Sequence, residues 1–164
     1  MRVAAFVVLT LVGQRLLGLP GAPPWLTDLW LPIVWLVWPP MREDRPWPFW
    51  AMVLLGLGWD VVTGPVIGPG GIAWSGAGLA IAWLARRVGD RSPVTWAAAG
   101  GAAAGAVMLL DRLARLPLGL AGPWRGLPAL RVLLLAVLWC GIVGTVQRFD
   151  VAAAVRRVRR RRLR

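Results

Sequence analysis

The sequence predicts an all-α integral membrane protein, built as a bundle of six transmembrane helices. Of its 164 residues 58% are hydrophobic and 16% are charged, and the mean hydropathy is +0.64. A soluble domain of this length is much less apolar. The apolar residues gather in six runs, each close to the roughly 20 residues that a helix needs to cross a bilayer. We therefore expect one transmembrane domain over 1–150 and an Arg-rich cytoplasmic tail over 151–164.

The first apolar run is expected to form a regular helix, and the second is expected to form a bent one. The run from Val3 to Leu19 could be a secretory signal, but no small-residue cleavage site follows it and more apolar runs do. We therefore expect an uncleaved first helix. The run from Trp25 to Trp38 contains Pro32, which should bend it, and it stops at Pro39-Pro40.

The other four runs have clearer limits. They extend from Pro48 to Thr63, from Gly71 to Ala85, from Val94 to Leu110 and from Leu127 to Gln147. The second to fourth runs of the chain are short for a ~30 Å hydrocarbon layer, so we expect local thinning of the bilayer or burial within the bundle. Ala97, Gly101 and Gly105 follow one another at four-residue spacing, which favours close helix packing.

The arginines predict the orientation of the bundle. All 19 basic residues are Arg, and the formal net charge is +12. Six spans with both termini inside place 14 of them on the inner side. The five on the outer side are Arg15, Arg112, Arg115, Arg125 and Arg131. Because Arg-rich loops stay in the cytoplasm, this imbalance predicts a multi-pass protein with both termini cytoplasmic.

Several polar side chains then fall at the outer ends of the spans. They are Gln14, Arg15, Asp28 and Asp60, with Asp111 and Arg112 in the same leaflet. One interpretation is that polar residues simply mark helix ends. The other is a polar cluster in which Arg15 neutralises Asp28 or Asp60, and the remainder meets a partner or water. Asp60 costs less than the roughly 2.5–3.5 kcal/mol of a mid-membrane carboxylate, but it still requires a partner, with Arg15 the leading candidate.

Tryptophan and cysteine are expected to be structural. Most of the Trp residues fall near the two predicted interfaces, as in aromatic belts. They are Trp25, Trp59, Trp74 and Trp124 near the outer boundary, and Trp38, Trp47, Trp50, Trp83 and Trp96 near the inner one. The single Cys140 lies inside the last span, where we expect a buried, space-filling thiol.

No catalytic constellation is expected, so the sequence does not indicate an enzyme. The chain has no His and no Lys, and Ser75 and Ser92 have no candidate base. Seven carboxylates on separate elements form neither an acid/base pair nor a metal cage, so we expect no metal and no cofactor. The sequence Gly68-x-Gly70-Gly71 joins two apolar helices, whereas a phosphate-binding loop joins a strand to a helix.

The basic tail is expected to bind anionic lipids. Each Arg near an anionic leaflet is worth about 1 kcal/mol. The candidate residues are Arg156, Arg157, Arg159 and Arg160. A cytoplasmic filament is the alternative partner of the tail. Nucleic acid is a less favoured one and is not expected, because the arginines are placed as in membrane proteins.

The hairpin between the third and fourth runs carries a family resemblance. Its sequence is Gly56-Leu57-Gly58-Trp59-Asp60-Val61-Val62-Thr63-Gly64-Pro65-Val66-Ile67-Gly68. This resembles the Gly-x-x-x-Asp-x-x-x-Gly-x-x-x-Gly stretch of the rod shape-determining MreD family, with Gly64, Pro65 and Gly68 in the hairpin turn. The Gln14 end of the first span and Thr27-Asp28-Leu29, where the family has Pro-Asp-Leu, are also similar. The resemblance covers roughly residues 10 to 90, and the remainder matches only in hydropathy and in its basic C-terminus.

This resemblance implies a fold, a location and a role. The implied fold is a six-helix bundle like the substrate-binding subunits of energy-coupling-factor transporters, in the bacterial cytoplasmic (inner) membrane. The implied role is non-catalytic. The protein would belong to the cell-elongation (rod-shape) machinery, bind an MreC-like bitopic membrane protein, and help regulate peptidoglycan synthesis by the RodA polymerase and penicillin-binding transpeptidase complex.

The alternative is a substrate-binding subunit of a small-molecule, vitamin-type membrane transporter. Such subunits need a polar pocket of solute size, and they often carry an Ala-x-x-x-Ala contact on the first span. Here that span begins Val3-Ala4-Ala5-Phe6-Val7-Val8-Leu9, which lacks this contact.

Overall fold

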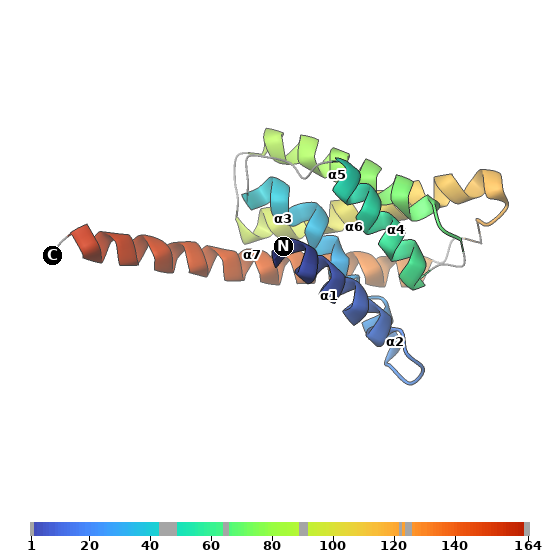
Figure 1. The fold of residues 1–164 in the computed structure, drawn as a ribbon, viewed down its shortest axis with the longest axis horizontal. Coiled ribbons are helices and arrows are strands. Elements are labelled where there is room, and N and C mark those ends of the chain that lie inside the picture. Colours follow the sequence, from blue (N-terminus) through green and yellow to red (C-terminus); the bar gives the residue numbers. More distant parts are fainter. Residues whose placement is uncertain are drawn as a thin grey trace.

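All regular secondary structure in the described part of the chain is helical. The computed structural model describes residues 2–42, 49–63, 66–88, 92–121, 123 and 126–162. Within these ranges every regular element is a helix and no strand occurs (Figure 1). Six of these helices have nine residues or more. The predicted all-α class is therefore confirmed.

The elements follow the predicted runs in order. They are α1 (Arg2–Leu17), α2 (Pro24–Thr27), the 3-10 turn η1 (Leu31–Ile33), α3 (Val34–Arg42), α4 (Phe49–Thr63), α5 (Pro69–Arg87), α6 (Pro93–Arg115), the 3-10 turn η2 (Leu116–Leu118) and α7 (Gly126–Arg162).

The second predicted span is not one helix. The chain forms the short α2, leaves helical structure over residues 28–30, and then enters η1 and α3. Pro32 lies in η1, so the run is interrupted near this proline and not merely bent. Pro39 and Pro40 lie inside α3, which continues to Arg42, so the predicted stop at these residues is wrong. Pro39 is fully buried, and we infer that packing of α3 on α5 and α6 compensates for the hydrogen bonds that the prolines remove.

The later helices begin near their predicted starts, and two extend beyond their predicted ends. α4 and α5 match the predicted limits to within two residues. α6 runs past Leu110 to Arg115, which places Asp111 on the same helix. α7 continues past Gln147 to Arg162, so the backbone of the basic tail prolongs the last helix.

Two helices are long and apolar enough to cross a membrane. They are Pro93–Leu118 and Gly126–Phe149, with mean hydropathies of 1.5 and 2.2. Val7–Leu17 and Phe49–Thr63 are apolar but shorter. Within the described residues, length and composition therefore support two spans by themselves, which is fewer than the six predicted.

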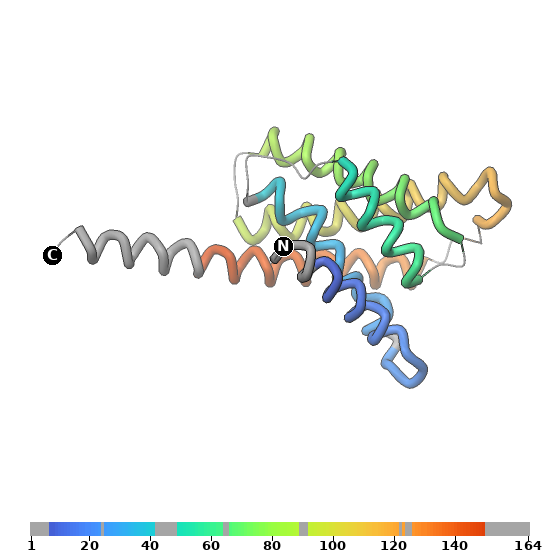
Figure 2. Tube along the Cα trace, viewed as in Figure 1, coloured from blue at the N-terminus to red at the C-terminus, as the bar shows by residue number. Residues whose placement is uncertain are grey.

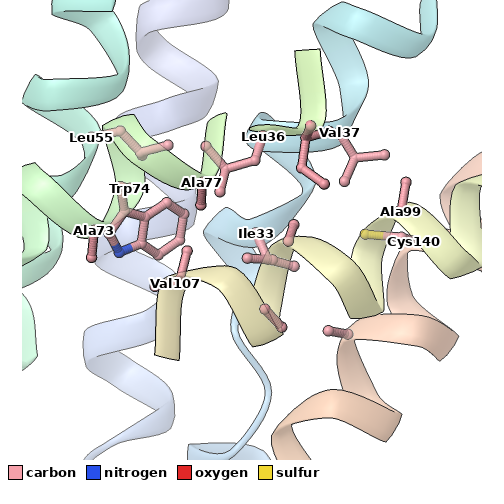
Figure 3. Packing of buried hydrophobic residues seen from close by; sticks show 14 of the residues in the cluster. Ile33, Leu36, Val37, Leu55, Ala73, Trp74, Ala77, Ala99, Val107 and Cys140 are labelled. Carbon is pink, nitrogen blue, oxygen red and sulfur yellow. The ribbon is translucent and has the colours of Figure 1, made fainter. Parts of the chain in front are cut away.

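Helices α5 and α6 pack against each other, and each contacts several further helices. α5 also contacts α4, α6 pairs extensively with α7, and α3 packs against both α5 and α6. α1 contacts α4 and η1, and Figure 2 shows it running obliquely to the long axis of α7. The core lies where α3, α5, α6 and α7 meet (Figure 3). Its fully buried side chains include Ile33, Leu36, Val37, Trp74, Val107 and Cys140.

Small residues bring α6 and α7 together. A Cβ added at Gly100 would lie 2.6 Å from the Cβ of Cys140 and 2.7 Å from the Ala136 carbonyl oxygen. One added at Gly101 would lie 2.8 Å from the Val137 side chain. These distances are too short for real side chains, so the glycines permit the contact. The predicted close packing is confirmed at Gly101, whereas a Cβ at Gly105 would make only an ordinary contact, 3.6 Å from the Leu133 side chain. Cys140 is buried, as predicted.

Candidate functional site

Asp60 lies in the last turn of α4 and holds the start of α5. Its side chain is fully buried. The Gly68 N–H donates to Oδ2 at 2.8 Å, and the Gly70 N–H donates to Oδ2 at 2.9 Å and to Oδ1 at 3.1 Å. The first N–H groups of a helix lack partners within that helix and carry partial positive charge. The carboxylate of one helix therefore caps the next, and we call residues 56–71 with these contacts the Asp60 hairpin.

Glycine is required at three positions of the hairpin, and the physical reason differs between them. Gly68 has a φ of 134°, a backbone conformation that L side chains rarely adopt. A Cβ at Gly56 would collide with the Gly70 carbonyl group and would lie 2.8 Å from the Gly71 Cα. A Cβ at Gly70 would collide with Asp60 and would lie 2.7 Å from the Gly56 carbonyl oxygen. The two helices thus touch backbone to backbone beside the carboxylate.

Gly64 and Pro65, the first two predicted residues of the hairpin turn, lie outside the described residues. Gly68, the third, occupies the N-cap position of α5.

The ion-pair partner of Asp60 is Arg115. Its Nη2 lies 3.8 Å from Oδ1 of Asp60, and its Nε donates to Oδ2 of Asp111 at 2.8 Å. Arg115 stands four residues after Asp111, the spacing of side chains on one face of a helix. This arginine connects α6 to the Asp60 hairpin, and the sequence reasoning did not select it. Its four-residue spacing from Asp111 was the sequence signal that could have pointed to Arg115.

Arg15 does not pair with Asp60, so the predicted partnership is wrong. Its Nη1 donates instead to the carbonyl oxygen of Val62 at 3.1 Å. The last carbonyls of a helix lack partners within it, and a cation is favourable there. Arg15 of α1 therefore caps the end of α4, two residues beyond Asp60.

The other two members of the predicted polar cluster lie apart from Asp60. Gln14 is buried, and its Oε1 accepts the N–H of Leu31 at 3.0 Å, which fixes the start of η1. Asp28 is partly exposed in the turn after α2. Among the described residues, Asp28 makes no ion pair with Arg15. The four residues therefore do not form one cluster.

Three indole rings, one of them from Trp59 of the Asp60 hairpin itself, contact one another at tilted angles. The Trp59 ring centroid lies 5.1 Å from that of Trp30 and 5.3 Å from that of Trp74. Trp59, Trp74 and Trp96 are 8%, 0% and 3% exposed. The belt prediction is wrong for these three, because the rings fill the core. It agrees with Trp25, Trp50 and Trp83, which are exposed, whereas Trp38 is partly buried against the core. Trp47 and Trp124 lie outside the described residues.

The remaining predicted residues have local structural partners or lie beyond the described side chains. Ser75 donates to the Ile72 carbonyl, and Ser92 accepts the Thr95 N–H as the cap of α6. In the described part of the chain, no group of three His, Cys, Asp or Glu residues could hold a metal ion. The side chains of Arg156, Arg157, Arg159 and Arg160 are outside the described part.

Comparisons with protein-family models, with curated protein sequences and with solved structures find no match to this chain.

Proposed function

We propose that this chain is a non-catalytic, six-span component of the bacterial cell-elongation machinery, similar to MreD. In this proposal it binds an MreC-like single-span protein and helps regulate the RodA polymerase and its penicillin-binding transpeptidase. The Asp60 hairpin carries the proposal. Its described motif residues, Gly56, Asp60 and Gly68, have interlocking roles in one structural unit.

The surface of the bundle supports a place in the membrane. Large apolar side chains more than half exposed occur on α1, α4, α5 and α7, and examples are Val8, Leu54, Ile72, Leu130 and Leu138. A soluble monomer rarely exposes so much apolar surface, whereas lipid covers it in a bilayer. Together with the Arg distribution, this favours six spans in the inner membrane with both termini cytoplasmic. In this arrangement the basic end of α7 would lie against anionic lipids.

The topology predicts which loops are accessible from outside. In a Cys140→Ala background, we expect Pro123→Cys, in the exposed α6–α7 connection, to react with an impermeant maleimide on intact cells. Ser92→Cys, at the start of α6, and Arg164→Cys should react only after the membrane is permeabilised. Labelling of either site on intact cells would overturn the topology.

Co-purification tests the proposed role. A tagged chain isolated in mild detergent should recover a single-span MreC-like protein, identified by mass spectrometry. As a matched control, the lipid-facing variant Leu138→Ala should recover the same partner. If the wild-type chain is correctly inserted and folded but recovers no single-span MreC-like protein, the proposal is contradicted.

A second function is favoured by one observation. A cavity of about 290 Å³ is lined in part by Trp30, Trp59 and Trp74, and it lies near the lower end of the volumes typical of ligand pockets. Its presence is expected of a substrate-binding subunit of a vitamin-type transporter, although its wall is mostly apolar and such subunits need a polar pocket. Recovery of an ATPase-driven transport module in the same purification would support the transporter and not the elongation component.

A further inference from the structure

One exposed face of α5 changes character along the helix. Ile72, Leu79 and Trp83 are each more than half exposed, and their spacings of seven and four residues place them on the same side of the helix. Arg87 continues this row four residues further, with Arg86 beside it, and both arginines are exposed. We call these five residues the α5 outer face.

The order of these side chains matches the depth profile of half a bilayer. At a rise of about 1.5 Å per residue, Trp83 lies about 16.5 Å along the helix from Ile72, close to half of the ~30 Å hydrocarbon layer. Arg87 lies about 6 Å beyond Trp83. The aliphatic side chains would thus meet acyl chains, the indole the interface and the guanidinium groups the lipid headgroups. This order favours a lipid as the occupant, because a protein partner does not require it.

The two arginines of the face are available to an anion. α5 contains no acidic residue, and within the described residues neither Arg86 nor Arg87 makes an ion pair. The guanidinium carbon of Arg87 lies 5.1 Å from the centroid of the Trp83 ring, which is a cation–π contact. The ring therefore orients this guanidinium, and the N–H groups at its edge can donate to phosphate oxygens.

We propose that the α5 outer face binds one anionic phospholipid, whose phosphate contacts Arg86 and Arg87 and whose acyl chain lies along Leu79 and Ile72. Two adjacent arginines favour a lipid with net negative charge over a zwitterionic one. The cytoplasmic leaflet, where the proposed topology places this end of α5, carries such lipids. The proposal rests on the proposed membrane placement and does not depend on the MreC-like partner.

Site-specific fluorescence quenching tests the proposal. In the Cys140→Ala background, Leu79→Cys carries a bimane label on the α5 outer face, and the full chain is placed in phosphatidylcholine nanodiscs. These contain equal amounts of either phosphatidylglycerol or phosphatidylcholine with a nitroxide on the acyl chain. We expect about fivefold stronger quenching by the phosphatidylglycerol probe, the factor that one arginine near an anionic headgroup provides.

A second label and a double variant assign the site. Bimane at Leu138→Cys, on the exposed side of α7, should be quenched similarly by the two probes, although α7 carries the basic tail. The combined change Arg86→Gln and Arg87→Gln should abolish the preference at Leu79. Circular dichroism and gel filtration establish that each variant is folded.

A tryptophan variant tests the positioning of the guanidinium. Trp83→Leu should reduce the preference for phosphatidylglycerol at Leu79, because the ring that contacts Arg87 is lost while both charges remain. Trp25→Leu, which changes an exposed tryptophan outside α5, should leave the preference unchanged.

Four results would overturn the proposal. The first is equal quenching by the two probes at Leu79. The second is a preference that persists in the folded double arginine variant. The third is an equal preference at Leu138, which would assign it to general attraction by the basic tail. The fourth is quenching at Leu138 but by neither probe at Leu79, which would assign the face to a second copy of the chain. Each can occur whether or not an MreC-like partner is recovered, whereas absence of quenching at both labels would contradict the membrane placement as well.

Discussion

Asp60→Leu is expected to destabilise the folded protein by about 3–5 kcal/mol. The substitution removes the acceptor of the Gly68 and Gly70 N–H groups and leaves both donors at the buried start of α5 without their partner. It also removes the charge that faces Arg115. Leucine has a similar size, so the loss arises mainly from the missing hydrogen bonds and charge. Unfolding by denaturing detergent, followed by tryptophan fluorescence, measures the change.

Two variants make this result specific to the carboxylate. Asp60→Asn keeps one acceptor oxygen and should lose less stability than Asp60→Leu. Asp28→Leu removes a partly exposed carboxylate from the turn after α2 and should stay within about 1 kcal/mol of the wild type. Wild-type stability for Asp60→Leu would mean that Asp60 only marks the end of a helix.

Gly56→Ala is expected to cost about 2–3 kcal/mol, because a methyl group is forced against the backbone of Gly70 and Gly71. Backbone atoms cannot move aside as a flexible side chain can, so α4 and α5 must separate. Separation would lengthen the hydrogen bonds between Asp60 and Gly70. The same unfolding titration measures this loss.

Gly105→Ala in α6 is the matched control for this prediction. A Cβ there would lie 3.6 Å from the Leu133 side chain, an ordinary contact. Since alanine favours helices over glycine by about 0.5–1 kcal/mol, this variant should equal or exceed the wild type in stability. Equal effects of Gly56→Ala and Gly105→Ala would contradict the close contact between α4 and α5.

Most of the helix pattern, and the need of Asp60 for a polar partner, could be predicted from the sequence, because apolar runs and a carboxylate within one are local signals. The sequence could not show which of the two arginines, Arg15 or Arg115, pairs with Asp60. Both arginines fall at the same predicted membrane side, and hydropathy does not tell which helices are neighbours. In the fold α6 brings Arg115 to Asp60, whereas α1 reaches the end of α4 and places Arg15 on Val62.

The predictions for the tryptophans and for the prolines were wrong for the same physical reason. The position of an indole along a span does not reveal whether it faces lipid or a neighbouring helix, so the burial of Trp59 and Trp74 was not predictable. Likewise, helix-breaking by Pro39 depends on the packing around it. Tertiary contacts decide both cases.

The most direct test is a pair of double-mutant cycles. One cycle combines Asp60→Leu with Arg115→Met, and the other combines Asp60→Leu with Arg15→Met. Free energies of unfolding in detergent give the coupling energies. We expect a coupling of about 1 kcal/mol between Asp60 and Arg115, and additivity within about 0.5 kcal/mol for Asp60 and Arg15. Coupling to Arg15 with additivity at Arg115 would contradict the arrangement in which Arg115 of α6 pairs with Asp60.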